Sequence, residues 1–281
     1  MSRPRLTRRG RLVVMVTGAL AAVSAVLVPV SVLTGGDGGG RPTALTIPEG
    51  LRAVQVYESV DRILDVPAGT TRDTVAAARL GLPKSARGNP EGFLFPATYP
   101  IDATTTPAGL LTYMVTTAHQ RFAPGGGTAA PDAKSGGAPA GTADPALYRT
   151  ITIASIVQAE AATAADMGKV ARVVHNRLAL DMPLQMDSTV NYALNRSTLD
   201  TSHADTKTNS PYNTYEHKGL PPTPIGNPGE EAMKAALHPT PGDWLYFVTV
   251  KPGDTRFTHR YAEHHENVQE FNRNRGGDAK S

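Results

Sequence analysis

Hydrophobic positions divide the chain into one long apolar run near the N-terminus and a series of shorter amphipathic segments. Residues 12–33 contain no charged side chain and follow five arginines within the first eleven residues. A run of this length can cross the roughly 30 Å hydrocarbon core of a bilayer as a helix, and flanking arginines favour the cytoplasmic side. We therefore predict a cytoplasmic basic tail over 1–11, a transmembrane helix over 12–34 and a linker over 35–44.

A cleaved signal peptide is the alternative interpretation of the same run. The residues AVSA, which end at Ala25, resemble a small-residue cleavage site. The apolar run is long for such a signal, so we favour the anchor. The chain is then a single-pass protein of the plasma (inner) membrane, with everything after the linker on the extracytoplasmic side.

Residues 45–122 alternate short extended segments with helical periodicity, which predicts a small α+β unit. Thr71 or Asp73 is available to cap its second helix. Pro107 suits the first position of a longer amphipathic helix, and the apolar side chains that this helix turns to one face are Leu110, Met114 and Val115.

Two other segments have too few apolar residues to build a core. Residues 123–143 are rich in Gly, Ala and Pro, and such a composition does not offset the entropy of ordering the chain. We expect a flexible insertion there and a disordered tail over 274–281.

Residues 144–273 predict a second unit, so the expected fold class is α+β. Asp144 is a good N-cap and Pro145 fits the first turn of a helix that runs to about Ala162. The remaining expected elements are a helix over 165–180, short helices over 188–194 and 229–239, two strands over 243–250 and 255–260 joined by a turn, and a last helix over 261–271.

Glu160 lies on the apolar stripe of the first of these helices, one turn after Ile156 and Val157. Burial penalises the charged form of a carboxyl group and raises its pKa. A proton held near neutral pH can be donated to a leaving oxygen, as glycoside cleavage requires. The position therefore makes Glu160 a candidate general acid.

Glycoside hydrolases pair such an acid with a second carboxylate, and none is obvious here. Asp166 falls in a helix junction and Asp187 in a loop. A reaction with a nucleophile on the sugar itself needs only one carboxyl. A structural role stays open, in which Glu160 pairs with Arg172 or Arg177, or lies at the exposed edge of the stripe.

Two polar loops follow, and both interleave uncharged donors and acceptors with aromatic rings. This composition suits a neutral, polar ligand such as a sugar chain, although each residue taken alone is also common in ordinary turns. The candidate positions are Gln185, Asp187, Ser188 and Thr189 in the first loop, and Ser210, Tyr212, Asn213, Thr214 and Tyr215 in the second.

Composition narrows the function classes. The formal charge of +3 arises largely at the N-terminus, so nothing favours binding of nucleic acid. His259, His264 and His265 raise the alternative of a metal-dependent hydrolase. However, the chain has no HExxH pattern, and adjacent histidines on a helix point about 100° apart. We expect neither a metal ion nor a cofactor.

The sequence resembles the YceG-like family of endolytic murein transglycosylases. The segments that carry the resemblance occur in the family's order over about 145–271 and are ASIVQAEA, KVARVVHNRLALDMPLQMDSTVNYAL, SPYNTYEHKGLPPTPIGNPGEEAMKAALHP, WLYFV and RFTHRYAEHHENV. LTIPEG and PEGFLFPATYPI, further upstream, also resemble family segments.

The resemblance implies cleavage of the β-1,4 bond between N-acetylmuramic acid and N-acetylglucosamine in nascent peptidoglycan, leaving a 1,6-anhydro end. The matching catalytic position is Glu160, as acid and then base. Gln158 stands where other members often have glutamate. The positions that match the family's groove, assigned to substrate binding or to shaping the site, are Gln185, Asp187, Ser210, Tyr212, Asn213, Thr214 and Tyr215.

The region before Phe122 is short for the LysM-like module of this family, so we expect a reduced LysM-like subdomain over 45–122 and a catalytic domain over 144–273. The implied partners are peptidoglycan glycan strands and the inner membrane, with peptidoglycan synthases as further candidates. A non-catalytic, membrane-anchored glycan-binding scaffold of the cell-wall machinery is the alternative function.

Overall fold

The computed structural model describes residues 32–34, 42–123, 145–196 and 201–278. The predicted basic tail, almost all of the predicted membrane helix, Asp144 and nearly all of the predicted insertion lie outside these ranges. The last three residues of the predicted linker, 42–44, are described and belong to a strand. Val32–Thr34, the end of the predicted membrane helix, form a short strand instead. Within the described ranges, no helix combines the length and the apolar character needed to cross a bilayer.

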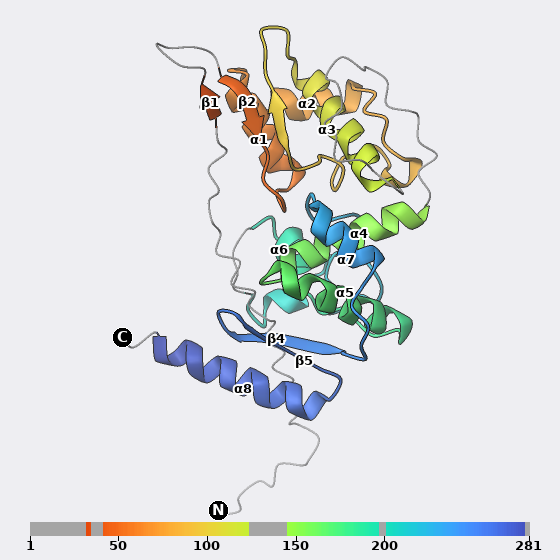
Figure 1. Ribbon diagram of the computed structural model, residues 1–281, viewed down its shortest axis with the longest axis vertical. Coiled ribbons are helices and arrows are strands. Elements are labelled where there is room, and N and C mark those ends of the chain that lie inside the picture. The colour runs from red at the N-terminus through yellow and green to blue at the C-terminus, as the bar shows by residue number, and fades with distance from the viewer. Residues whose placement is uncertain (1–31, 35–41, 124–144, 197–200, 279–281) are drawn as a thin grey trace, which may run out of the picture.

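The chain forms an N-terminal lobe, a central group of helices, and a hairpin with a long helix at the far end (Figure 1). Strands and helices are mixed along the sequence, as the α+β prediction requires. The elements of the N-terminal lobe are β1 (Val32–Thr34), β2 (Pro42–Thr46), α1 (Ala53–Ile63), α2 (Thr70–Ala77), η1 (Lys84–Ala86), β3 (Thr98–Pro100) and α3 (Pro107–Phe122).

The sheet of this lobe has the order β1-β2-β3, with both pairings antiparallel. Leu45 of β2 pairs with Tyr99 of β3, and both side chains are buried. The helix predicted at Pro107 is confirmed, because Thr106 caps α3 by accepting a hydrogen bond from the Gly109 amide.

The predicted cap of α2 is wrong. Gly69 occupies the N-cap position with a positive φ, and neither Thr71 nor Asp73 caps the helix. Instead Asp61, at the end of α1, accepts hydrogen bonds from the amides of Gly69 and Thr71. A carboxylate from the preceding helix therefore satisfies the free amides of α2.

The rest of the chain follows the predicted order closely. Its elements are α4 (Pro145–Glu160), α5 (Ala164–Ala179), α6 (Asp187–Ala193), η2 (Asp205–Lys207), α7 (Glu230–Leu237), β4 (Tyr246–Lys251), β5 (Asp254–Thr258) and α8 (Tyr261–Asp278). Helix α8 continues beyond the predicted end at 271 and includes the first residues of the predicted disordered tail.

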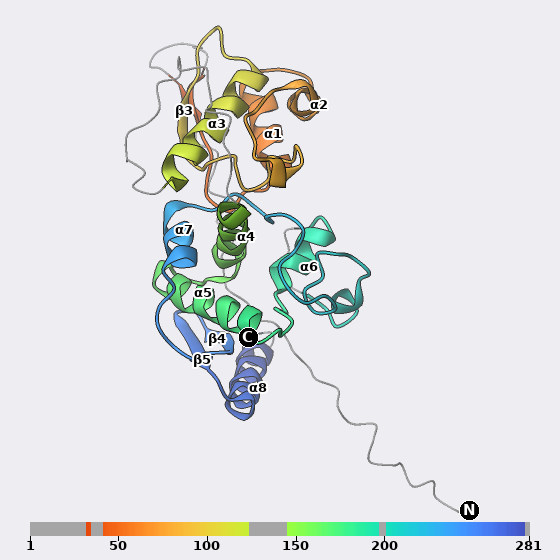
Figure 2. The ribbon, with the colours of Figure 1, turned by 90° about the vertical axis from the view of Figure 1, so that its right-hand side faces the viewer.

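Helix α4 lies beneath the N-terminal lobe, with α7 on one side and α6 on the other (Figure 2). Every residue from Ile151 to Val157 is buried. The apolar stripe predicted from the sequence is therefore only part of its buried surface, because neighbours cover α4 on all sides. Its last residue, Glu160, is carried to the place where α4 meets α6.

The N-terminal lobe and the central group of helices, which forms a second lobe, share one hydrophobic core. Gly92 of the N-terminal lobe packs so closely that a Cβ atom there would lie 2.7 Å from Pro224 and 2.8 Å from Ile151. Asn227 is fully buried, donates to the Leu51 carbonyl and accepts from the Leu94 amide. Since buried polar groups at this contact are paired, the lobes form a fixed seam.

Candidate active site

The Glu160 side chain is buried at the C-terminal end of α4 and faces the start of α6. Its Oε1 accepts two hydrogen bonds from Ser188, one from the amide at 3.1 Å and one from the hydroxyl at 2.6 Å. No described residue donates to Oε2. One carboxyl oxygen is thus held in place, and the other is free to meet a ligand.

The surroundings favour the protonated form of Glu160. Burial raises the pKa of its carboxyl to about 7, and the nearby negative charge of Asp187 acts in the same direction. The hydrogen bonds from Ser188 and the positive charge of Arg177 oppose the rise. Because the carbonyl end of a helix also disfavours a negative charge, the end of α4 suits an acid that keeps its proton near neutral pH.

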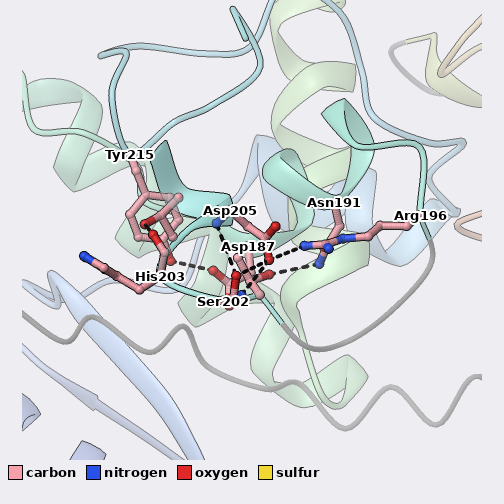
Figure 3. Close-up of polar contacts among 9 residues, drawn as sticks. Asp187, Asn191, Arg196, Ser202, His203, Asp205 and Tyr215 are labelled. Atoms are coloured by element: carbon pink, nitrogen blue, oxygen red, sulfur yellow. Dashed lines mark hydrogen bonds and ion pairs between the residues drawn. The ribbon is translucent and has the colours of Figure 1, made fainter. Parts of the chain in front are cut away.

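Asp187 lies closer to Glu160 than the sequence suggested. It is the first residue of α6 instead of a loop residue, and its charge is near enough to raise the pKa of Glu160. Its Oδ1 accepts a 2.5 Å hydrogen bond from the Tyr215 hydroxyl (Figure 3). Burial, and the charge of Asp205 nearby, raise the pKa of Asp187 to about 6.

A turn next to α6 carries Asp205. Its carboxylate accepts hydrogen bonds from the amide and hydroxyl of Ser202 and pairs with Arg196 at 2.5 Å (Figure 3). These donors hold the pKa of Asp205 down at about 2. The turn therefore places a permanent negative charge on one side of α6, which contributes to the raised pKa of Asp187.

The arginines considered as structural partners of Glu160 are engaged elsewhere. Arg172 donates to the carbonyls of Pro239 and Thr240. Arg177 donates to the carbonyls of Leu184 and Leu245, both at 2.7 Å. No ion pair joins either arginine to Glu160 in the described part of the chain. The paired, purely structural role is therefore not what this geometry supports.

Arg177 instead fixes the first polar loop. It also donates to the side-chain oxygen of Gln185 at 3.3 Å, and Gln185 has a φ of +52°, a conformation that L residues rarely adopt. The backbone amide of Gln185 donates a hydrogen bond to the backbone carbonyl of Thr214. Gln185 therefore stands where the two predicted loops meet, with its side chain oriented by a buried cation.

Asn213 and Thr214 build the second loop from inside. Asn213 is fully buried, donates to the carbonyls of Thr206 and Thr208, and accepts from the Tyr215 amide. The Thr214 hydroxyl accepts from the Met186 amide. Both side chains use their polar groups internally, which suits shaping of the site. Contact of either residue with a substrate stays a prediction.

The two remaining predicted residues lie further along the loop. The Ser210 hydroxyl accepts from the Tyr212 amide. The Tyr212 ring is half-buried, packs 5.0 Å from the ring of Tyr192, and shares a hydrogen bond with Thr223. Glu160, Asp187, Gln185, Thr214 and Tyr215 thus lie around the start of α6. Tyr212 instead packs against Tyr192 near the far end of α6, and Ser210 bonds the Tyr212 amide.

Gln158 faces away from this cluster. Its side-chain oxygen accepts from the Gly229 amide at 3.0 Å, and its side chain also bonds the carboxylate of Glu49 in the N-terminal lobe. An amide can accept on one side and donate on the other. Glutamine therefore fits at a position where glutamate would repel Glu49.

Glu91 is a second buried carboxyl, and the sequence analysis assigned it no role. It accepts hydrogen bonds from the Ala53 amide and from the Tyr192 hydroxyl. The signal was present, since Glu91 stands directly before the apolar residues of GFLFP. A carboxyl group next to such an apolar stretch is predicted to be buried, by the same argument that made Glu160 a candidate.

The three histidines considered as metal ligands do not converge. His259 lies 3.5 Å from Asp243, and His264 stacks on the ring of Tyr246 with the ring centres 5.0 Å apart. Over the described ranges, no group of three or more His, Asp or Glu side chains is arranged to hold a metal ion. The metal-dependent alternative therefore has no ligand set in this part of the chain.

The motifs, the fold and the buried acid at the end of α4 together define one protein class. A family model, described as the YceG-like family, matches residues 28–270. The chain therefore belongs to the YceG-like family. Its structure is also similar to that of a YceG-like protein from Listeria monocytogenes, with a TM-score of 0.63 and 28% identity over 80% of this chain and 75% of that one.

Two relatives carry a functional name. A protein of Bacillus subtilis (strain 168), named endolytic murein transglycosylase, is 35% identical over 182 residues, 64% of this chain. A protein of Streptococcus pneumoniae serotype 2 with the same name is 34% identical over 191 residues, 66% of this chain. The chain spans only 48% and 33% of the length of these two relatives.

Proposed function

We propose that this protein is an endolytic lytic transglycosylase, which cleaves the β-1,4 bond between N-acetylmuramic acid and N-acetylglucosamine in nascent peptidoglycan. The observation that carries the proposal is the state of Glu160, a buried acid with one oxygen held by Ser188 and the other without a donor among the described residues. The names of the relatives support the substrate class.

The proposed reaction needs one carboxyl group acting twice. Glu160 first donates its proton to the glycosidic oxygen, the bond from that oxygen to C1 of the muramic sugar breaks, and the N-acetylglucosamine leaves with a free hydroxyl. The Glu160 carboxylate then takes the proton of the muramic 6-hydroxyl while O6 bonds to C1. Glu160 ends protonated, no water is consumed, and the new end is a 1,6-anhydro sugar.

Asp187 and Tyr215 support the first step in this scheme. The negative charge of Asp187 raises the pKa of Glu160, and the Tyr215 hydroxyl orients the Asp187 carboxylate. Gln185 and Tyr212 are the side chains that we assign to contact with the sugar chain. The half-buried ring of Tyr212 suits the apolar face of a sugar, and Gln185 offers an amide held in a fixed orientation.

We also propose the cellular placement that the sequence predicts. Residues 12–31, the part of the predicted membrane helix that precedes β1, anchor the chain in the plasma membrane. The catalytic unit acts on the extracytoplasmic side, where peptidoglycan synthases are candidate partners. The N-terminal lobe is a reduced LysM-like subdomain. Its order of β2, α1, α2 and β3, with the two strands antiparallel neighbours, supports this assignment.

Incubation of the purified chain with isolated peptidoglycan, followed by mass spectrometry of the released fragments, tests the proposal. We expect internal cleavage with anhydro-ended products, and no such release by Glu160→Gln. Release of anhydro ends by that variant would refute the role of Glu160. Glycan binding without any cleavage by the wild-type chain would favour the scaffold alternative.

The influence of the Asp187 charge on Glu160 favours a second candidate, a two-carboxylate hydrolase. In that mechanism Asp187 acts as base or nucleophile, and water ends on the product. The same mass spectra separate the two, since a reducing end is heavier than an anhydro end by one water. We rank the hydrolase second because Tyr215 already bonds one oxygen of Asp187.

A further inference from the structure

Glu91 ties the N-terminal lobe to the helix that carries the partners of Glu160. Its Oε1 accepts from the amide of Ala53, the first residue of α1, at 2.9 Å. Its Oε2 accepts from the hydroxyl of Tyr192, near the end of α6, at 3.0 Å. One buried carboxyl group therefore joins two elements that belong to different lobes.

A neighbouring arginine strengthens the same contact. The guanidinium of Arg52 lies 5.1 Å from the centre of the Tyr192 ring and donates to the carbonyl of Arg196 at 2.8 Å. A cation over an aromatic face is attracted to it. The N-terminal lobe thus holds the end of α6 through the ring of Tyr192, through its hydroxyl, and through the backbone just beyond the helix.

The opposite end of α6 is the part that faces Glu160. The helix has seven residues, begins with Asp187 and Ser188, and reaches Tyr192 after little more than one turn. Such a short helix moves as one unit, so a displacement at Tyr192 also displaces Ser188. Ser188 supplies both hydrogen bonds that orient the Glu160 carboxyl.

We infer that Glu91 is a positioning residue of the active site, acting from the N-terminal lobe through Tyr192 and α6 on the geometry of Ser188 and Glu160. The inference rests on the proposed function for its consequence in catalysis. It does not make Glu91 a second acid, because both of its oxygens accept hydrogen bonds within the protein. The N-terminal lobe then belongs to the catalytic machinery, beyond any role in gripping glycan.

Substitutions at both ends of the contact test the inference in the full-length chain. Glu91→Ala removes both hydrogen bonds, and Tyr192→Phe removes only the one between the lobes. Glu91→Gln is the conservative variant, since its oxygen can accept from Ala53 and its amide can donate to the Tyr192 hydroxyl. Glu58→Ala, on the exposed side of α1, is the matched control.

The first measurement needs no substrate. Hydrogen exchange followed by mass spectrometry compares peptides that cover α6 and α5 in each folded variant. We expect faster exchange across α6 in Glu91→Ala and Tyr192→Phe, with α5 unchanged. Glu91→Gln and Glu58→Ala should match the wild-type chain. Wild-type exchange of α6 in both Glu91→Ala and Tyr192→Phe would overturn the inference.

The second measurement is the rate of anhydro-end formation on uncross-linked glycan strands, at a temperature where every variant is folded. Misplacement of a catalytic group should lower kcat by about 10- to 100-fold in Glu91→Ala and Tyr192→Phe, with KM unchanged. The double variant should lose no more kcat than the less active of the two single variants, because both substitutions act on one contact. If Glu91→Ala does not fold, Tyr192→Phe carries the test.

The possible results separate this inference from the proposed function. A wild-type chain that forms no anhydro ends would refute the function, and the exchange data would still decide whether Glu91 holds α6. An active wild-type chain with unchanged kcat in Tyr192→Phe would refute the positioning role alone. Loss of activity in Glu91→Gln as deep as in Glu160→Gln would also overturn it, by pointing to a direct chemical role.

Discussion

Glu160 and Glu91 occupy similar surroundings and differ in how their carboxyl oxygens are hydrogen-bonded. Each is about 95% buried, with relative exposures of 5% and 4%, and burial raises the pKa of each to about 7. Glu91 accepts a hydrogen bond on each oxygen. Glu160 accepts both of its hydrogen bonds on Oε1 and leaves Oε2 without a donor in the described part of the chain.

Burial and a raised pKa therefore do not identify a catalytic acid by themselves. Perturbed carboxyls occur at structural contacts as well as at functional sites. What separates these two is the oxygen that remains available to another molecule. Both oxygens of Glu91 accept hydrogen bonds, one from each of the two lobes that it joins. Among the described residues, only one oxygen of Glu160, at the end of α4, has a donor.

The same substitution at both positions is the most direct test of the difference between Glu160 and Glu91. Glu160→Gln should lower the rate of anhydro-end formation by about 100- to 10,000-fold, since an amide cannot transfer the proton. Glu91→Gln should retain most of the activity, because its amide can keep both contacts. Quantitative mass spectrometry of the products measures both variants, and equal losses would erase the distinction.

Glu160 and Glu91 should contribute in the same way to the pH dependence of the free energy of unfolding. Both folded-state pKa values, about 7, lie above the ordinary 4.5, so the folded protein binds these protons more tightly than the unfolded chain. The free energy of unfolding should fall as pH rises from about 4.5 to about 7, by up to about 3 kcal/mol per carboxyl.

Each Glu→Gln variant should therefore lose part of this pH dependence. Urea unfolding at pH 5 and pH 8 measures it, with Glu58→Gln as the exposed control. A variant whose stability falls between these pH values as much as that of the wild-type chain would contradict the raised pKa at that position.

Removal of the Ser188 hydroxyl should weaken only the Glu160 site. Ser188→Ala deletes the 2.6 Å hydrogen bond and keeps the one from the amide. Less precise orientation of the acid should lower kcat by about two- to tenfold. Activity should decline with rising pH as Glu160 ionises, and this limb should move to higher pH, because the lost bond favoured the carboxylate. A shift to lower pH would contradict the assigned contact.

Asp187→Asn should shift the pH dependence of activity by a smaller amount than Ser188→Ala and in the opposite direction. The variant removes the negative charge that raises the pKa of Glu160 and keeps an oxygen that can accept from Tyr215. The alkaline limb of the pH–rate profile should move to lower pH. If activity were instead abolished at every pH, Asp187 would have a direct chemical role, as in the hydrolase alternative.

The sequence predicted local features well. Apolar periodicity located α4, α5 and α8, and Pro107 located the start of α3, since these signals lie within a few residues of one another. Contacts between distant segments were beyond it. Asp61 replaces the expected cap of α2, and the Glu91 to Tyr192 bond joins residues 101 positions apart.

The candidate site shows the same division. The helical position of Glu160 made it a candidate acid and left a structural role open, and the polar loops together with the family motifs favoured the catalytic interpretation. The proximity of Asp187 could not be inferred, because it depends on how α6 folds back onto the end of α4. The engagement of Arg177 with backbone carbonyls, instead of with Glu160, depends on the path of the 183–185 loop.

The close approach at Gly92 makes the contact between the two lobes sensitive to substitution at this position. A single methyl group at this position would collide with Pro224 and Ile151, and the backbone, with a φ of +87°, disfavours any replacement. Gly92→Ala would act as a wedge between the lobes, one residue from the carboxyl that grips α6. Even the smallest side chain is thus too large for the present packing of the two lobes at this point.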